Sequence, residues 1–199
     1  GGIAGLLLAR QIRQEFPGQS VAVVERMKRP LPDAAHKVGE SSVELGSQYM
    51  ERLGLKDYLL SRHLVKFSLR FFPGGGHRPL AERTEIGPFA NPIIRSYQLD
   101  RGRLEEDLRG FNEADGVTML EGAKVKDIRL GEAGADHLVS FERDGQPRQI
   151  AARWVVDATG RSAIIRRQLK LTRGSRHEAS AGWFRIKGKL DIDDLVPAS

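Results

Sequence analysis

The chain has 199 residues and a net charge of +6, from 32 Lys and Arg against 26 Asp and Glu. Apolar residues make up 40% and charged residues 29%, a balance typical of a globular protein with one domain, or one domain and part of another. The sequence contains no cysteine, which excludes disulfide scaffolds, thiol nucleophiles, iron–sulfur clusters and cysteine-based zinc sites. It also fits a reducing compartment, so we expect a cytoplasmic protein.

No apolar run approaches the ~20 residues that span a bilayer, and no signal peptide is visible, so we expect no membrane span. Basic clusters such as Arg166–Arg167 alternate with acidic ones, which favours a solvated surface over a site for a phosphate-rich ligand. No nucleic-acid module is recognisable, so we expect no nucleic-acid partner. Because the chain begins Gly1-Gly2 rather than with methionine, we expect a fragment, truncated at both ends.

The opening of the chain predicts the later part of a βαβ unit. Residues 3–16 carry apolar side chains at helical spacing, and Pro17-Gly18 ends that helix. Residues 20–25 are a short β-branched run, typical of a buried parallel strand. Residues 26–40 are rich in proline and charge and predict a loop. We therefore expect a turn, a helix and a strand in this order.

The next segment predicts two short helices and then a strand. Residues 43–60 are broken near Gly54, and Ser41 or Ser42 is the expected N-cap. The alternating run 66–72 predicts a strand. The glycines and prolines that follow, up to residue 96, predict a loop or an inserted segment.

The second half predicts one long helix and a β-meander. Asp100 is placed to cap a helix over residues 101–114. Asp144-Gly145 predicts a hairpin turn, and residues 162–169 a short helix. The expected strands in this half are 97–100, 118–121, 125–130, 137–143, 149–156 and one that begins within 181–190. The whole pattern predicts an α/β domain with an inserted β-meander.

A dinucleotide site is indicated by Gly2, Gly5 and Glu25. Gly2 and Gly5 have the spacing of the last two glycines of G-x-G-x-x-G, whose first glycine and preceding strand would lie upstream of Gly1. Gly2 allows backbone to approach a pyrophosphate at a helix N-terminus, and Gly5 allows close packing of helix on strand. Glu25 follows Gly5 by 20 residues at a strand end, where a carboxylate can bind both hydroxyls of an adenosine ribose.

Two further segments have the character of cofactor loops. Residues 37–42, K-V-G-E-S-S, precede a helix and could either cap it or lie against a flavin. Residues 155–162, V-V-D-A-T-G-R-S, run from a strand into a glycine turn and a helix, which brings backbone amides to a bound cofactor or serves as an ordinary joint.

Taken in order, G-x-x-G, V-V-E-R, K-V-G-E-S-S, Y-Q-L-D-R-G-R-L-E-E-D-L and W-V-V-D-A-T-G-R resemble flavin-dependent halogenases of the tryptophan-halogenase type. They also resemble the wider superfamily of FAD-dependent monooxygenases and geranylgeranyl-reductase-like enzymes. The resemblance covers nearly the whole chain. It implies a glutathione-reductase-type, Rossmann-like FAD-binding fold, and an enzyme that uses reduced FAD and oxygen to make an electrophilic halogen for an aromatic or electron-rich substrate. A separate flavin reductase is the implied partner.

The resemblance also implies a set of FAD-binding residues. Glycines of the first motif would lie at the pyrophosphate, Glu25 at the adenosine ribose with Arg26 beside the adenine, and the G-E-S loop at the flavin. Arg101 rivals Arg103 as the arginine near FAD, and the backbone of Val125 would contact the adenine. The full set is Gly2, Ile3, Ala4, Gly5, Glu25, Arg26, Gly39, Glu40, Ser41, Arg103, Val125, Asp157, Thr159 and Gly160.

Lys66 is the candidate catalytic residue. In the halogenases a lysine follows the G-E-S segment at the start of a strand, and Lys66 fits that placement. An ammonium group can hydrogen-bond a hypohalous acid or form a haloamine, and so deliver the halogen. An ordinary surface lysine at a strand start is the other interpretation.

Several features of the family lie outside this sequence. The W-x-W-x-I-P motif of halogenases is missing, and so is the second, Gly-Asp flavin motif. An aromatic hydroxylase, a geranylgeranyl-type reductase and, from another class, a non-catalytic nucleotide-binding module therefore remain alternatives. The five histidines show no metal-ligand spacing, so no metal is expected.

We expect four parts along the chain. Residues 1–64 form the first part of the FAD-binding domain and residues 65–99 the start of the substrate-domain strands. Residues 100–170 return to the FAD-binding domain with the meander, and residues 171–199 begin the substrate domain.

Overall fold

The computed structural model of the chain describes residues 1–31, 41–66, 69–88, 90, 93–174, 180, 187–188 and 190–195. Gly39, Glu40 and nearly all of the strand expected within 181–190 lie outside the described residues. Within the described part, no helix is both long and apolar enough to cross a membrane.

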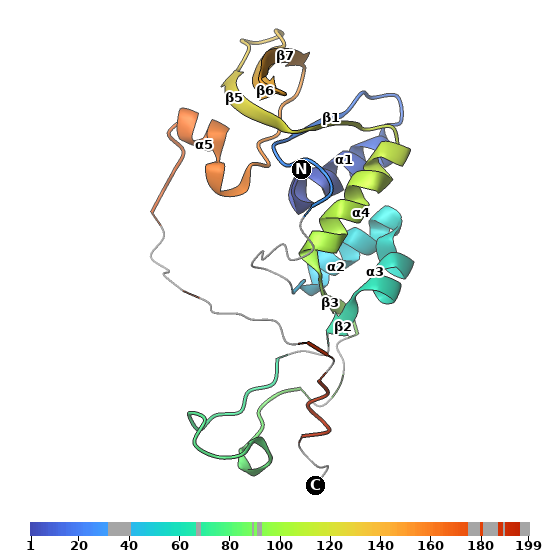
Figure 1. Ribbon diagram of the computed structural model, residues 1–199, viewed down its shortest axis with the longest axis vertical. Helices are drawn as coiled ribbons and strands as arrows, with labels where there is room; N and C mark the ends of the chain where they lie inside the picture. The colour runs from blue at the N-terminus through green and yellow to red at the C-terminus, as the bar shows by residue number, and fades with distance from the viewer. Residues whose placement is uncertain are drawn as a thin grey trace.

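The centre of the fold is a parallel pair of strands packed on two helices (Figure 1). Strands β1 (Ala22–Glu25) and β4 (Thr118–Glu121) pair in parallel, and helices α1 (Ile3–Glu15) and α4 (Arg101–Ala114) lie side by side against them. The buried core comes from the apolar faces of these elements. Its fully buried leucines on the two helices are Leu6, Leu104 and Leu108. These bounds confirm the helix, strand and helix expected from periodicity.

A second helical pair packs on the same core. Helices α2 (Glu44–Met50) and α3 (Lys56–Arg62) are joined by the helical turn η1 (Glu51–Leu55). Gly54 has φ of +77° inside η1, a conformation that only glycine adopts without strain. The break expected near Gly54 is therefore confirmed.

The expected serine cap of α2 is wrong. Its N-cap residue is Val43, and no side chain caps the helix. The hydroxyl of Ser42 instead accepts a hydrogen bond from the backbone N–H of Tyr97 at 2.7 Å and lies 2.8 Å from Ser47 Oγ. A buried strand N–H needs an acceptor more than an exposed helix end does, because water can serve the helix end.

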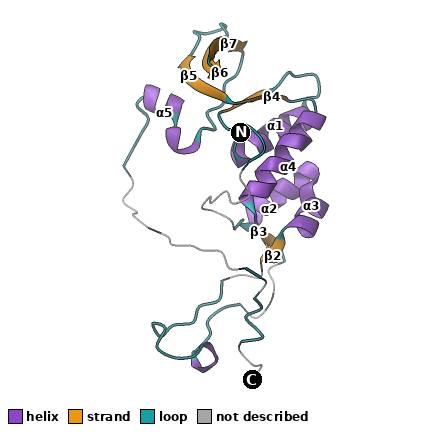
Figure 2. Cartoon of the chain, in the orientation of Figure 1, coloured by secondary structure: helices purple, strands orange, loops and turns teal. Residues whose placement is uncertain are grey.

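A short antiparallel ladder lies below the helices in Figures 1 and 2. Strands β2 (Leu64–Lys66) and β3 (Ser96–Gln98) pair through Leu64↔Gln98 and Lys66↔Ser96. Within the strand expected over residues 66–72, Lys66 belongs to β2, residues 67–68 lie outside the described residues, and the expectation is wrong for residues 69–72. Beyond Lys66, the only described pairing of the run is an isolated bridge between Phe71 and Ile86, and a strand exists only where a neighbour supplies its hydrogen bonds.

In its described residues, the loop expected over residues 73–96 carries a short 3-10 helix, η2 (Leu80–Glu82). Glycines 74, 75 and 76 all have positive φ there, which keeps the segment out of regular structure.

The meander is formed by β5 (Ala123–Arg129), β6 (His137–Arg143) and β7 (Gln146–Ala152). The turn at Asp144-Gly145 has positive φ at both residues, as a tight hairpin requires. The strand expected over 149–156 is wrong after Ala152. Residues 153–156 have no strand neighbour among the described residues, and Trp154 is 82% exposed. The chain continues into η3 (Gly160–Ser162) and α5 (Ile164–Gln168).

Candidate functional site

The amino end of α1 is open to an anion. Its N-cap residue is Gly2, which has no side chain to cap the helix, and the first turn holds no acidic residue. The first N–H groups of a helix have no partner within the helix, and the helix dipole makes this end positive. α1 therefore presents free donors and a positive end at the G-x-x-G motif, which is the arrangement that binds a pyrophosphate.

The glycines at this helix end allow neighbouring segments of the chain to pack closely against it. A Cβ built on Gly1 would lie 2.2 Å from Glu25 Oε2, and one on Gly5 would lie 3.3 Å from the Cβ of Ala158. A Cβ on Gly2 would meet only Glu105 Oε1, at 4.0 Å. The first motif, the end of β1, the turn after the meander and the start of α4 are thus brought together.

Glu25 ends β1 beside this glycine segment. Its Oε1 accepts a hydrogen bond from the Met27 N–H at 2.7 Å, and its Oε2 lies 3.1 Å from the amine of Gly1. Burial raises the pKa of Glu25, whereas the Met27 N–H and the positive charge of Arg109 lower it, and the pKa lies below its ordinary value in this chain. The carboxylate stays ionised at neutral pH. Each oxygen keeps acceptor capacity for a ribose hydroxyl.

Asp157 stabilises the turn that faces Gly5. Its Oδ1 accepts hydrogen bonds from the N–H and Oγ1 of Thr159, at 3.1 and 2.5 Å, and its Oδ2 accepts one from the N–H of Ile165 at 2.8 Å. Burial raises the pKa of Asp157, but these donors lower it further than burial raises it. The carboxylate therefore shapes the turn, while Thr159 and Gly160 are exposed.

The start of α4 carries both candidate arginines. Asp100 caps the helix by accepting from the N–H of Arg103 at 3.3 Å, which confirms the expected cap. The side chain of Arg103 is exposed. Arg101 is tied to the carboxylate of Glu105, with its Nη2 at 2.5 Å from Oε1. Glu105 is fully buried beside Gly2. Sequence reasoning missed Glu105, because no motif marks this residue and its burial depends on how other elements pack over α4.

Ser41 and the strand of Lys66 both pair with β3. Ser41 forms a bridge with Gln98, and Gln98 pairs on its other side with Leu64. Lys66 lies two residues further along β2, opposite Ser96, and is partly exposed. The ladder therefore connects the strand of Lys66 to the end of the K-V-G-E-S-S loop.

Val125 lies in the meander, on β5, which contacts β1. It pairs with Phe141 at a register shift between Val125 and Asp127. A bulge of this kind leaves a backbone group unpaired. Arg26 is exposed directly after Glu25.

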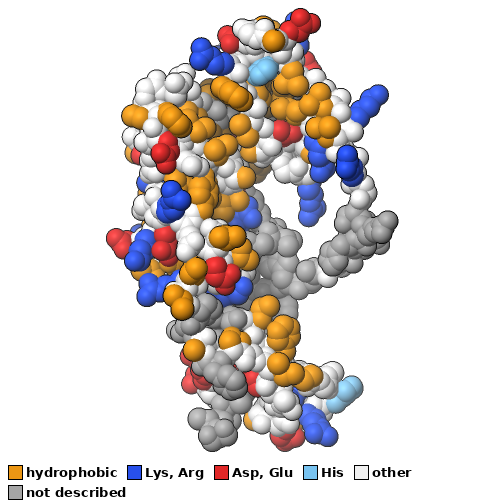
Figure 3. Space-filling view, turned by 180° about the vertical axis from the view of Figure 1, so that it is seen from behind, with side chains coloured by type: hydrophobic (Ala, Val, Ile, Leu, Met, Phe, Trp, Pro, Cys, Tyr) orange, Lys and Arg blue, Asp and Glu red, His pale blue; other side chains and the backbone are white. Residues whose placement is uncertain are grey.

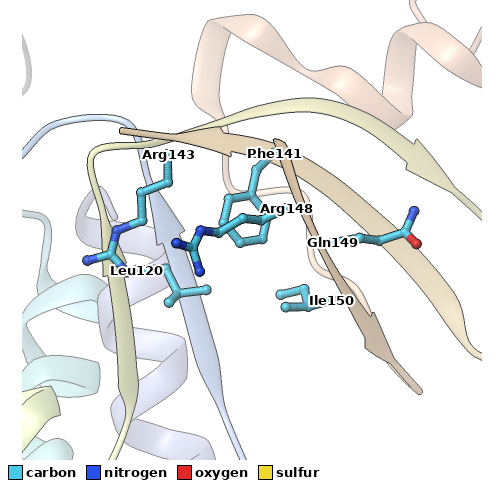
Figure 4. Close-up of a pocket in the computed structure, with 6 residues that line it drawn as sticks. All are labelled: Leu120, Phe141, Arg143, Arg148, Gln149 and Ile150. Atoms are coloured by element: carbon cyan, nitrogen blue, oxygen red, sulfur yellow. The ribbon is translucent and has the colours of Figure 1, made fainter. Parts of the chain in front are cut away.

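The described residues also contain a shallow hollow of about 340 Å³ in the meander (Figure 4). Its lining consists of Leu120, Phe141, Arg143, Arg148, Gln149 and Ile150. Apart from Leu120, these residues belong to β6 and β7, and none belongs to the glycine motifs. No group of acidic or histidine side chains suited to a metal ion occurs in the described part of the chain.

Comparison with known proteins identifies the family. A family model described as "FAD binding domain" matches residues 1–198. The chain belongs to this FAD-binding family, and FAD is the cofactor that its open helix end and strand-end carboxylate fit. The Rossmann-like fold expected from the sequence is confirmed.

Two relatives and one solved structure show the range of the family. A flavin-dependent halogenase, chlA of Dictyostelium discoideum, is 30% identical over 94% of this chain and 35% of its own. An uncharacterised aromatic compound monooxygenase, YhjG of Bacillus subtilis, is 24% identical over 86% of this chain and 32% of its own. The structure of a flavoprotein/dehydrogenase from Cytophaga hutchinsonii matches with a TM-score of 0.71 and 26% identity, over 89% of this chain and 42% of its own. The chain spans about a third of the length of the two relatives.

Proposed function

We propose that the chain is the FAD-binding portion of a flavin-dependent halogenase. The observation that carries this proposal is the 30% identity to a flavin-dependent halogenase over 94% of the chain. The amino end of α1, open and lined by glycine, supports the cofactor half of it.

In this proposal different residues of the chain bind different parts of FAD. The free N–H groups from Gly2 to Gly5 bind the pyrophosphate, and Glu25 accepts hydrogen bonds from the ribose hydroxyls. Arg26 and the backbone of Val125 bind at the adenine, while Ser41 and Arg103 or Arg101 lie toward the flavin. Gly39 and Glu40, outside the described residues, would complete the flavin loop. FAD supplies the redox chemistry that activates oxygen.

Lys66 is the proposed catalytic residue. Its ammonium group would hydrogen-bond hypohalous acid; alternatively its deprotonated amine would take the halogen from hypohalous acid with release of water, giving a haloamine. The halogen would then pass to an electron-rich aromatic substrate, which loses a proton. The ladder supports this role, because β2, which ends at Lys66, pairs through Leu64 with Gln98, and Gln98 forms a bridge with Ser41 of the flavin loop. A separate flavin reductase would supply reduced flavin. The four expected domain parts remain part of the proposal.

The test uses the full-length protein with a flavin reductase, NADH, halide and an electron-rich phenol. Wild type should give halogenated product by mass spectrometry. Lys66→Met should lose product while reduced flavin is still reoxidised by oxygen at the wild-type rate. Lys56→Met is the matched control, because Lys56 is an exposed lysine at the start of α3, and it should keep wild-type activity. Unchanged halogenation in Lys66→Met would remove the lysine from the mechanism.

An aromatic hydroxylase or geranylgeranyl-reductase-like enzyme is the alternative, favoured by the similarity to the Bacillus subtilis aromatic compound monooxygenase. A hydroxylase would give an oxygenated product without halide, and Lys66→Met would keep its activity. A non-catalytic nucleotide-binding module would bind FAD or ADP and turn over neither substrate. Titration of FAD into the full-length protein comes first, because absence of flavin binding contradicts every enzyme proposal.

A further inference from the structure

Two carboxylates lie side by side at the cofactor end of the sheet. Glu25 and Glu121 are the last residues of β1 and β4, and they are partners in the parallel register. Partners in a sheet have Cβ atoms about 5 Å apart, and like charges at such positions repel. Glu25 therefore needs a nearby positive charge if it is to stay ionised and in place.

Arg109 is one such charge, and it helps to lower the pKa of Glu25. It lies on α4, is 1% exposed, and its Nη1 donates to the Met27 carbonyl at 3.3 Å and lies 3.5 Å from Glu121 Oε1. Among the described residues its Nε has no hydrogen-bond partner. Burying a guanidinium so incompletely bonded is costly. The cost indicates a role beyond packing α4 against the sheet.

Arg29 completes the arrangement on the solvent side. Its Nε lies 2.8 Å from Glu121 Oε1, and its backbone N–H donates to Glu121 Oε2 at 3.2 Å. Its outer guanidinium nitrogens bind Glu113. Glu121 is thus held between two guanidinium groups. Among the described residues, Glu25 accepts a hydrogen bond from the Met27 N–H and lies 3.1 Å from the nitrogen of Gly1.

We propose that Arg109 is a positioning residue for the adenosine half of FAD. By neutralising Glu121 and holding the carbonyl of Met27, it fixes the segment from Glu25 to Met27 so that the Glu25 carboxylate faces the ribose hydroxyls. The proposal rests on the FAD site described above and not on halogenation. In this role Arg109 does not contact the cofactor, yet it determines the affinity for the adenosine end of FAD.

The test separates the two halves of FAD. Binding of FAD, ADP and FMN to full-length Arg109→Met is measured by flavin fluorescence and, for ADP, by calorimetry. Affinity for FAD and ADP should fall by the same factor, about tenfold, as coupled charge networks of this size allow. Affinity for FMN should stay at the wild-type value, because FMN lacks the adenosine.

Arg13→Met is the matched control. Arg13 also holds backbone carbonyls, those of Asp115, Pro17 and Gln19, but it does so at the far end of α1. It should keep wild-type affinity for all three ligands. Equal losses of FMN and ADP affinity in Arg109→Met, or no loss at all, would overturn the proposal.

If Arg109→Met does not fold, Arg109→Lys gives the same comparison, since it keeps the charge and loses the fork of donors. It should show a smaller loss, again confined to FAD and ADP. If wild type binds FAD but does not halogenate, the proposed function fails while this inference stands. If wild type binds FAD and neither Arg109 variant changes the FAD-to-FMN ratio, the inference alone fails.

Discussion

The imidazole Nδ1 of His63 accepts a hydrogen bond from the backbone N–H of Asp100, at 3.1 Å. This bond joins the residue before β2 to the residue that caps α4. An acceptor Nδ1 carries no proton, so the neutral ring has its proton on Nε2, which faces the hydroxyl of Tyr58 at 3.4 Å. Tyr58 in turn donates to Asp107 at 2.7 Å. The candidate lysine strand and the candidate arginine helix are therefore tied together through a neutral histidine.

This relationship predicts a loss of stability in mild acid. Burial lowers the pKa of His63, with Arg103 adding to this and Asp100 and Asp107 opposing it. A lowered pKa means that the unfolded chain binds the proton more readily. The contribution of His63 is therefore fully present above its ordinary pKa of 6.5 and is lost as pH falls through its folded value. Urea unfolding of the full-length protein at pH 7.5, 6.5 and 5.5 should show this fall.

His63→Leu is the control for that titration. It removes the acceptor of the Asp100 N–H, so it should lower the free energy of unfolding at pH 7.5 by about 1–3 kcal/mol. Its unfolding free energy should then fall less than that of wild type between pH 7.5 and 5.5. Equal slopes in the two proteins would show that other groups carry the acid dependence.

The elements predicted best are those whose sequence signals, such as helix periodicity and capping residues, lie within the element itself. Helix α4 was predicted with its bounds and its Asp100 cap, because periodicity and capping are contained in the segment itself. The error after Ala152 has the opposite origin, since residues 153–156 look like a strand but strand pairing depends on a distant neighbour. The same holds for residues 69–72, which find only one bridge.

The candidate site was predicted unevenly for the same reason. Gly2, Gly5 and Glu25 follow a spacing that encodes the helix end and the strand end, and the structure brings these elements together. Glu105 and Arg109 follow no motif. Their burial depends on how α1 and the segment after β1 fold over α4, which the periodicity of α4 alone does not contain.

Ser42 should be required for stability, although its neighbour Ser41 should not. Ser42 is buried, and its hydroxyl serves both the backbone of Tyr97 and the hydroxyl of Ser47. Ser42→Ala leaves these buried groups short of a partner, which should cost about 1–3 kcal/mol. Ser41→Ala changes an exposed side chain and should stay within about 0.5 kcal/mol. Urea midpoints of the full-length proteins give the comparison, and equal midpoints would contradict it.

Alanine at Gly5 should weaken FAD binding, whereas alanine at Gly110 should stabilise the fold. A Cβ on Gly5 presses on Ala158 at 3.3 Å, whereas one on Gly110 meets nothing within 4 Å. Gly5→Ala should push the 157–160 turn from α1 and weaken FAD binding, with Gly5→Val weakening it more. Gly110→Ala should raise the free energy of unfolding by about 0.5–1 kcal/mol, the helix propensity difference, and leave FAD affinity unchanged. Flavin fluorescence titration and thermal melts measure both. Wild-type FAD affinity in Gly5→Val would refute the close packing.

Glu25→Gln should weaken FAD binding through charge alone, because glutamine keeps the shape of the side chain. Hydrogen bonds to a charged acceptor contribute about 1.5–3 kcal/mol, so the Kd for FAD should rise about 10- to 100-fold. Glu15→Gln, an exposed glutamate at the other end of α1, is the matched control and should bind FAD as wild type does.

The pH dependence of FAD affinity gives an independent check on Glu25. The lowered pKa of Glu25 keeps its carboxylate ionised throughout the range from pH 8 to pH 6, so this group should give wild type a flat FAD affinity there. Below the ordinary pKa of 4.5 the wild-type affinity should fall toward that of Glu25→Gln, because protonation removes the same charge that the substitution removes. Two affinity curves that stay parallel in acid, measured by fluorescence titration wherever both proteins remain folded, would place the ribose contact on another residue.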